Sequence, residues 1–251
     1  MRVALFATCV NDALYPDTAI ATVRLLERLG VEIDFPAAQT CCGQAQYNTG
    51  YREQAEPLVA RMARVFADYD YVVTPSGSCV AMVWENYPRI GAKARAEGRG
   101  KELARAARGL APRVVELTEF LVDVLRVVDV GAYYPHTVTY HPSCHGLRTL
   151  GLGERPLRLL QAVRGLRLIS LPGAEECCGF GETFAVKNPD VSAAMGADKI
   201  EHAASTGVQM LCGANSSCLM HLDGMLRRAD SPLRTVHIAE ILASTEQERT
   251  A

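Results

Sequence analysis

Eight of the nine cysteines fall into two matching sets, and cysteine thiolate is a soft ligand suited to iron–sulfur clusters, zinc or copper(I). The first set is Cys9, Cys41, Cys42 and Cys79, and the second is Cys144, Cys177, Cys178 and Cys218. Corresponding members lie 135, 136, 136 and 139 residues apart. Such small drift over four positions predicts an internal duplication, with one thiolate-based metal motif in each half.

Each set contains two adjacent cysteines followed by a glycine. Adjacent cysteines are awkward partners for a disulfide with each other, but both can reach one metal group. Gly43 and Gly179 have no Cβ, so the backbone there can turn sharply and approach a cluster closely. Their neighbouring N–H groups could donate hydrogen bonds to sulfur, which raises a cluster's potential. We therefore expect both glycines to contribute to cofactor binding.

Two alternatives concern the thiols themselves. Four thiolates also satisfy tetrahedral zinc, so zinc in one half is the alternative to a cluster there. The ninth cysteine, Cys212, lies inside an apolar run, and buried cysteines of this kind are commonly inert. An extra ligand is the other interpretation of Cys212, but we do not include it among the predicted ligands.

Three histidines lie close to the second set of cysteines. His141 and His145 flank Cys144, and His221 follows Cys218. One of them could tune or ligate a cluster, although the sequence favours a packing or supporting role for each. We find no Walker loop, no nucleophile elbow and only a fragment of a dinucleotide fingerprint, so no catalytic residue is predicted.

Composition places the 251-residue chain among ordinary globular proteins, with 49% hydrophobic and 22% charged residues. The net charge of −2 gives no sign of nucleic-acid binding. No apolar run reaches the roughly 18–20 residues of a spanning helix, and the apolar start is too short for a secretory signal. We expect a cytoplasmic protein that is not integral to a membrane, in which clustered cysteines indicate metal or redox chemistry.

Short apolar runs alternate with helical patterns along the chain, which predicts an α/β fold of two pseudo-repeated Rossmann-like halves with mostly parallel sheets. We expect the repeats at residues 1–130 and 131–251. Strands are expected at residues 3–8, 31–35, 71–75, 137–141, 166–171 and 208–212. Asp17 is expected to cap a helix that runs to Leu29, and residues 88–109 to form a loop and an exposed helix. The cysteines then follow the carboxyl ends of strands, where open α/β sheets place their sites.

Each Cys-Cys-Gly segment, set between two spaced cysteines, resembles the cysteine-rich CCG domain. That domain occurs twice in the heterodisulfide reductase B subunit and in the iron–sulfur subunit of glycolate oxidase. The resemblance is closer to the LutA/YkgE group of lactate utilisation proteins and covers nearly the whole chain. It is carried by residues 34–36 before the first pair and by residues 75–79, 177–181, 218–221 and 236–240.

The resemblance implies a cytosolic iron–sulfur electron-transfer subunit, with a 4Fe-4S cluster held by the eight repeated cysteines. Its implied partners are two other subunits of a lactate utilisation complex, LutB- and LutC-like, with which it oxidises L-lactate to pyruvate and without which it is not catalytic. The resemblance to heterodisulfide reductase implies a thiol–disulfide enzyme as one alternative. A non-catalytic zinc-binding scaffold is the other.

The chain departs from the broader domain in one respect. That domain usually ends in Cys-x-x-Cys, whereas Ser76 and Asn215 stand three positions before the last cysteine of each set. Close relatives often have a cysteine where this chain has Ser216. A five-thiolate, noncubane cluster like that of heterodisulfide reductase is therefore not expected.

Overall fold

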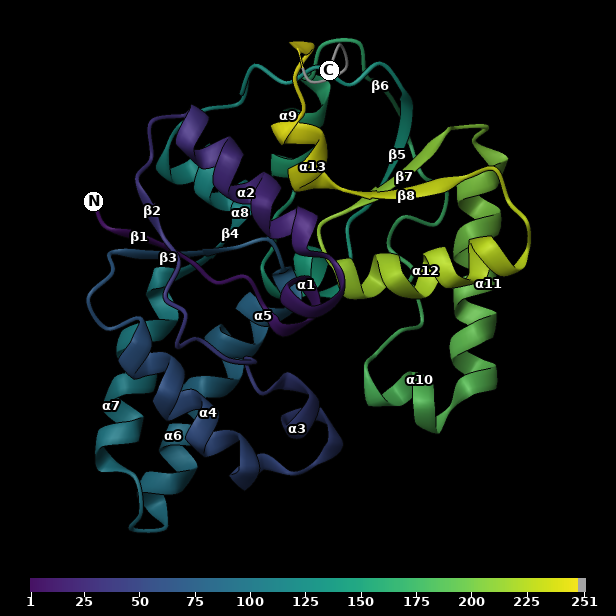
Figure 1. The fold of residues 1–251 in the computed structure, drawn as a ribbon. Helices are drawn as coiled ribbons and strands as arrows, with labels where there is room; N and C mark the ends of the chain where they lie inside the picture. The colour runs from purple at the N-terminus through teal and green to yellow at the C-terminus, as the bar shows by residue number, and fades with distance from the viewer. Residues whose placement is uncertain (248–251) are drawn as a thin grey trace.

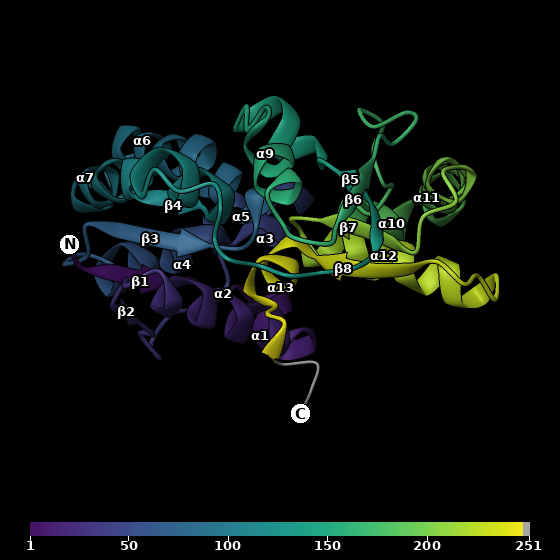
Figure 2. The ribbon, with the colours of Figure 1, turned by 90° about the horizontal axis from the view of Figure 1, so that it is seen from above.

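Two four-stranded parallel sheets with the same strand order form the centre of the protein in the computed structural model, which describes residues 1–247. The first sheet has the order β2-β1-β3-β4 and the second β6-β5-β7-β8. Their strands are β1 (Val3–Leu5), β2 (Ile33–Asp34), β3 (Tyr71–Thr74), β4 (Val114–Glu116), β5 (Thr137–His141), β6 (Arg167–Ile169), β7 (Met210–Gly213) and β8 (Arg234–His237). Figure 2 shows the two sheets on opposite sides of the molecule. The expected α/β fold of two Rossmann-like halves is confirmed.

The six predicted strands are all present, although most are shorter than expected. Of the four outer strands, β4 and β8 were not predicted. Each has only three or four residues and pairs in parallel with a strand far away in the sequence. Equally short strands such as β1 and β6 were predicted, but β4 and β8 run directly into the helices α8 (Leu117–Glu119) and α13 (Ile238–Ala243) without an intervening turn signal, and pairing in the sheet determines their conformation.

Helices cover both faces of the sheets (Figure 1). In the first half they are α1 (Cys9–Leu14), α2 (Pro16–Arg28), α3 (Gln44–Thr49), α4 (Arg52–Val65), α5 (Gly77–Ala81), α6 (Tyr87–Ala96), α7 (Lys101–Leu110) and α8 (Leu117–Glu119). In the second half they are α9 (Arg155–Gln161), α10 (Thr183–Lys187), α11 (Pro189–Ser205), α12 (Ser216–Arg228) and α13 (Ile238–Ala243). Among residues 1–247 no helix is both long and apolar enough to cross a membrane.

The prediction that Asp17 caps helix α2 is wrong, because the N-cap position is Tyr15, two residues earlier. Helix α2 begins at Pro16, so Asp17 lies in the first turn and makes no cap. Proline suits the first helical position because its fixed φ is already helical and its missing N–H would have no partner there. The helix ends at Arg28, and Gly30 follows with a φ of 78°.

The segment 88–109 is also different from the expected loop and exposed helix. It forms α6 and most of α7, which pack against each other and against α4 (Figure 1). Their inner faces bury small and aliphatic side chains, including Ile90, Ala94 and Leu110. Only 19 residues separate Cys218 from His237 in the second half, against 37 between the equivalent Cys79 and Glu116. The helical pair is therefore an insertion present in the first half alone.

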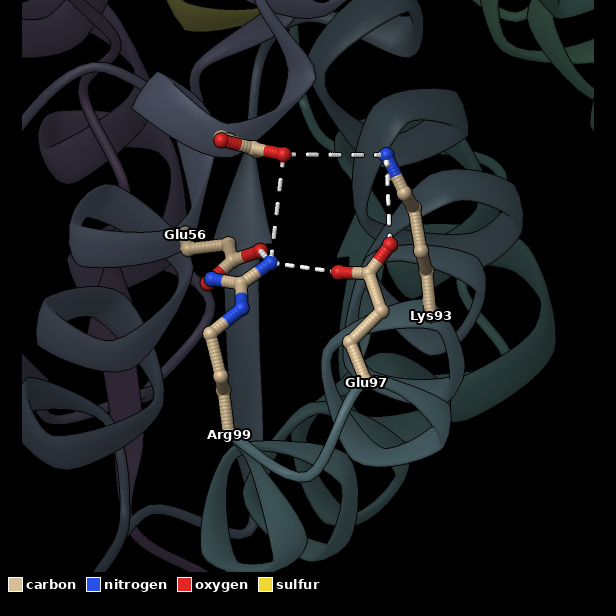
Figure 3. A network of polar contacts seen from close by, with 5 residues as sticks. Glu56, Lys93, Glu97 and Arg99 are labelled. Carbon is tan, nitrogen blue, oxygen red and sulfur yellow. Dashed lines mark hydrogen bonds and ion pairs between the residues drawn. The ribbon is translucent and has the colours of Figure 1, made fainter.

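A charged network joins this insertion to α4 (Figure 3). Arg99 lies 3.0 Å from a carboxylate oxygen of Glu56 and also pairs with Glu97. Lys93 lies 3.8 Å from Glu97. The side chains of Lys93, Glu97 and Arg99 are 41–49% exposed and that of Glu56 is 17% exposed, so most of these ion pairs are screened by solvent and contribute little to stability.

Each half has a helix that packs on a helix of the other half. Helix α13 packs on α2, where Thr18 donates a hydrogen bond to Glu240 at 2.7 Å and the guanidinium of Arg28 donates to the carbonyl of Ala243 at 2.7 Å. At the equivalent place, α8 contacts α9. One central core therefore contains side chains of both halves, such as Leu25 and Ile241. The division between residues 130 and 131 stays a prediction.

Asn215 links the segments that follow the carboxyl ends of the two sheets. Its side-chain oxygen accepts hydrogen bonds from the Ser78 amide at 3.1 Å and the Ser76 hydroxyl at 3.2 Å. Its amide nitrogen donates to the Ser143 hydroxyl at 2.8 Å. Ser76 and Asn215 also form an antiparallel backbone bridge. The two residues that stand where a Cys-x-x-Cys would begin therefore bind each other and hold the two motifs together.

Candidate metal centres

The first motif brings all four predicted thiols to one edge of its sheet. Cys9 opens α1 after β1, the pair Cys41 and Cys42 follows β2, and Cys79 lies in α5 after β3. The Sγ atoms of Cys9 and Cys41 are 3.5 Å apart, as are those of Cys42 and Cys79. Two thiolates on one tetrahedral zinc, with bonds of about 2.3 Å, would lie about 3.8 Å apart. Neighbouring thiols of this motif can therefore bind the same metal group.

The residue before the first cysteine of each motif has a backbone conformation that is unusual for a residue with a side chain. Thr8 has a φ of 69° and Ser143 a φ of 59°. The hydroxyl of Thr8 accepts a hydrogen bond from the Asn11 amide at 3.5 Å, and that of Ser143 accepts from the Gly146 amide at 3.2 Å. A non-glycine residue in this region costs roughly 1–2 kcal/mol and is typical of functional sites. The same strained turn aims the first thiol in both halves.

The glycine after each cysteine pair also has the same conformation in both halves. Gly43 has a φ of 84° and Gly179 a φ of 87°. The amide of each donates to a thiol sulfur two residues earlier, Cys41 or Cys177, at 3.4 Å. A Cβ at Gly179 would collide with the carbonyl oxygen of Ser192. These contacts match the expected close approach of the backbone and its N–H group to sulfur.

The first cysteine of each pair is the one poised to lose its proton. The pKa of the Cys41 thiol is lowered chiefly by a hydrogen bond from Cys42, and that of Cys177 chiefly by one from Cys144. The donating thiols have raised pKa values, because their hydrogen bonds hold their protons in place. Thiolate is the form that binds metal, so each motif is prepared for a ligand at the same position.

The first motif opens into a cavity of about 200 Å³. The walls include all four thiols and also side chains of the second half, namely Phe180, Glu182, Ser216 and Ser217. Cys9 is exposed, and the hydroxyl oxygen of Ser216 is buried without a hydrogen-bond partner. Soft thiolates around an enclosed space with an unsatisfied polar atom fit an inorganic cluster. The first centre is therefore built from one half and enclosed by the other.

One cavity residue of the second half, Glu182, contacts a side chain of the first half. Glu182 has a φ of 56°, and its carboxylate accepts a hydrogen bond from the Asn48 amide at 3.0 Å. Burial raises the pKa of this carboxyl group. Next to it, the hydroxyls of Thr49 and Thr183 lie 3.1 Å apart. These contacts fix α10 against α3 and define one wall of the cavity.

The second motif has the same chain of thiols and one additional donor. Cys144 and Cys177 are close enough to shift each other's pKa, as are Cys178 and Cys218. A ring nitrogen of His141 and the sulfurs of Cys178 and Cys218 all lie within 4.8 Å of one another. The pKa of Cys218 is lowered to about 5, chiefly by the hydrogen bond from Cys178, with the His141 imidazole adding to the effect. Thiolates and imidazole together suit zinc or an iron–sulfur group.

The other residues singled out in the sequence have protein partners. His145 Nε2 lies 3.5 Å from the side-chain nitrogen of Gln44, and His221 Nε2 lies 3.3 Å from the carbonyl oxygen of Ser192. Cys212 is fully buried in the central core, and burial raises its pKa, so it stays a thiol. Sequence reasoning missed the special position of His141. Its signal was that the equivalent residue of the first half is phenylalanine.

Comparison with known proteins gives a consistent match. The model of the cysteine-rich domain family called CCG matches residues 3–83 and 138–223, and each region contains one complete motif. A protein of Geobacillus thermodenitrificans named lactate utilization protein A is 53% identical over 96% of this chain and 98% of its own length. A protein of the same name from Geobacillus sp. strain WCH70 is 50% identical over 97% of this chain and all of its own.

Solved structures are much more distant. A glutamate racemase of Francisella tularensis in complex with D-glutamate shares 10% sequence identity, covers 96% of this chain and 77% of its own, and has a TM-score of 0.39. No functional conclusion is drawn from so low a similarity.

Proposed function

Because this chain belongs to the cysteine-rich CCG domain family and is at least half identical to two proteins named lactate utilization protein A, we propose that it acts in lactate utilisation as an iron–sulfur electron-transfer protein. Its main support within the structure is the group of four thiols around one cavity in the first half. The eight cysteines of the two motifs are the proposed ligands.

A 4Fe-4S cluster, when bound, supplies a one-electron redox couple to the protein. The chain's own residues hold and tune it. Cys41 and Cys177 offer thiolates that are already favoured over the thiol. The N–H groups of Gly43 and Gly179 donate to these sulfurs, and hydrogen bonds to cluster sulfur raise the reduction potential. The exposed Cys9 brings the first centre to the surface, where electrons can pass to a partner.

The proposed reaction is the oxidation of L-lactate to pyruvate, which releases two electrons and two protons. We assign the contacts with lactate to the other subunits of a cytoplasmic lactate utilisation complex, LutB- and LutC-like, and electron transfer to this chain. A bound cluster would carry one electron at a time, so passing on the two electrons of lactate would require further redox groups in those subunits. Growth on L-lactate that survives deletion of this chain would contradict the assignment.

The direct test is metal and acid-labile sulfide analysis of protein purified without oxygen, together with EPR spectra of its reduced and oxidised forms. We expect about four irons and four sulfides for each bound cluster. Cys42→Ser should remove the iron of the first motif, and Cys178→Ser that of the second. Cys212→Ser is the matched control and should leave both unchanged, since Cys212 lies in the apolar core. Protein that takes up neither iron nor sulfide on reconstitution would rule out this function.

One observation favours a second candidate, a zinc-binding scaffold. The 3.5 Å distances between paired sulfurs are close to the roughly 3.8 Å of two thiolates on one tetrahedral zinc ion. Such a protein would organise its partner subunits without carrying electrons, because zinc has no redox chemistry. Stoichiometric zinc without sulfide, and no EPR signal in either redox form, would establish this function in place of electron transfer.

A further inference from the structure

We propose that His141 is a metal ligand, so that the second motif binds its metal group through imidazole as well as thiolate while the first motif uses thiolates alone. The inference rests on the proposed function only in that the second motif must bind a metal. Nothing in it depends on lactate or on electron transfer.

The position of His141 is fixed by the sheet. It is the last residue of β5 and pairs in register with Gly213 of β7, so its ring lies where the strands end and the thiols begin. The side chain is 1% exposed. A ring nitrogen and the sulfurs of Cys178 and Cys218 lie within 4.8 Å of one another. Backbone pairing rather than a flexible loop therefore holds the ring beside the thiols.

Both ring nitrogens of His141 are buried; at most one is engaged, by the Cys218 thiolate, and the other has no hydrogen-bond partner among the described residues. Burying an imidazole in this way is unfavourable, because at least one ring nitrogen loses its interaction with water without a replacement. A metal ion between the ring and the two sulfurs would satisfy one nitrogen. His145 and His221 do not raise the same question, since Gln44 and Ser192 lie at hydrogen-bonding distance from them.

The duplication provides an internal comparison. The equivalent of His141 is Phe6, 135 residues earlier, which continues β1 by donating its amide to Val73 at 2.9 Å. Phe6 is fully buried, and its ring packs on Phe66 with centroids 5.9 Å apart. At the same backbone position the first half therefore has a phenylalanine in the core, and the second half has an imidazole that can bind a metal.

Imidazole binds metal as a neutral ligand, whereas each thiolate adds a negative charge. In a cluster this exchange raises the reduction potential, as it does where two histidines replace two cysteines in Rieske centres. In a zinc site the same set gives mixed cysteine and histidine coordination. Both cases share a bond between metal and imidazole, and the metal itself is decided by the test.

The test isolates the second centre in the full chain. In a Cys41→Ser/Cys42→Ser parent, bound metal belongs to the second motif. X-ray absorption at the iron and zinc edges counts sulfur and nitrogen donors, and pulsed EPR detects nitrogen coupling to a paramagnetic cluster. We expect a nitrogen donor in the parent that disappears in His141→Phe, which copies the first half. The control His145→Ala should keep it.

If a substitution at His141 abolishes metal binding altogether, added imidazole shows whether the lost ring was a ligand. In His141→Ala, imidazole that enters the vacated space should restore metal and nitrogen coordination, and failure to restore either would overturn the inference. So would an all-sulfur shell in the parent, or nitrogen retained in His141→Phe. Iron and sulfide in an all-sulfur shell would overturn His141 ligation while leaving electron transfer intact. Zinc with a nitrogen donor would support His141 and overturn an iron–sulfur centre in this half.

Discussion

The two halves have the same backbone around their thiols and different surroundings. Strand order, the strained turn before the first cysteine, and the glycine after the pair are repeated. The first motif faces a cavity that the second half completes, whereas the second has the buried His141 beside its thiols. The repeated backbone therefore places the cysteines, and the residues packed around them distinguish the two centres.

The largest expected difference between the halves is at the repeated glycine. Gly179→Ala places a Cβ against the carbonyl oxygen of Ser192 and 3.0 Å from Met195, in addition to the strain of its positive φ. We expect a loss of about 4 kcal/mol in the free energy of unfolding, measured by denaturant titration. Gly43→Ala meets only ordinary contacts, the nearest at 3.4 Å from Leu58, and should lose about 1–2 kcal/mol. Equal losses would show that the two turns are packed alike.

The next difference concerns pH, because equivalent helix caps are a carboxylic acid in one half and an imidazole in the other. Buried Glu116 accepts from the Thr118 amide at 2.7 Å, and burial raises its pKa from 4.5 to about 7. Buried His237 accepts from the Ala239 amide at 3.1 Å, and burial lowers its pKa from 6.5 to about 4. The contribution of Glu116 to folding stability is therefore fully present below pH 4.5 and is lost as pH rises through about 7. The contribution of His237 is fully present above pH 6.5 and is lost as pH falls through about 4.

Each effect is worth about 3 kcal/mol at its limit, and in the intact protein the two oppose each other. Glu116→Gln keeps an oxygen acceptor without the titration and should make stability rise more steeply from pH 4 to 7. His237→Asn should make stability fall over the same range. The measurement is the midpoint of urea unfolding at each pH. Parallel pH profiles for the two variants would contradict the assignment of these caps.

A smaller effect is expected at the contact between the motifs. Asn215→Ala removes three side-chain hydrogen bonds that reach Ser76, Ser78 and Ser143. We expect a loss of about 2–3 kcal/mol on thermal or denaturant unfolding, because buried partners are left unsatisfied. Ser76 is the equivalent residue of the other half, and Ser76→Ala removes only one hydrogen bond to Asn215. We therefore expect a loss of about 1 kcal/mol in the free energy of unfolding. A larger loss from Ser76→Ala than from Asn215→Ala would place the main contact in the first half.

The smallest effect should come from the insertion that only the first half has. Arg99→Ala removes the centre of the charged network in Figure 3. Because these groups are solvated, the free energy of unfolding should stay nearly unchanged, and added salt should not alter the comparison with the unsubstituted protein. A marked, salt-sensitive loss of stability would show that the network holds α6 and α7 in place.

The sequence predicted what depends on local pattern and missed what depends on distant contacts. The two cysteine sets, the parallel α/β halves and six strands could be read from spacing and apolar runs. Strands β4 and β8 could not, because each runs directly into a helix with no turn signal between them, and only its neighbour in the sheet shows that it is a strand. The charges and glycines of residues 88–109 predict a loop and an exposed helix, whereas the buried faces of α6 and α7 are lined largely by small alanines that give a weak apolar signal.

The candidate site shows the same division. The sequence places the thiols at strand ends, and the structure brings those of each set together. It does not reveal that Phe180 and Ser216 of the second half line the cavity of the first, since that depends on how the halves pack. His141, His145 and His221 all lie close to cysteines in the sequence, and only the structure separates His141, whose buried ring lies beside the sulfurs of Cys178 and Cys218 rather than beside a nitrogen or oxygen partner.

The exchange of helices between the halves has a consequence for how the protein is made. A chain emerging from the ribosome presents the thiols of the first half early, but the walls of their cavity include Phe180, Glu182, Ser216 and Ser217 of the second half. The helix that packs on α2 is α13, at residues 238–243. Domains usually fold in order as they are synthesised, and the first half has one core cluster of its own, but the cluster under α2 is completed only by residues of α13. The cavity around the first set of thiols is therefore complete only once Ser216 and Ser217 of the second half have been synthesised, so a cofactor in it is enclosed after both halves are available.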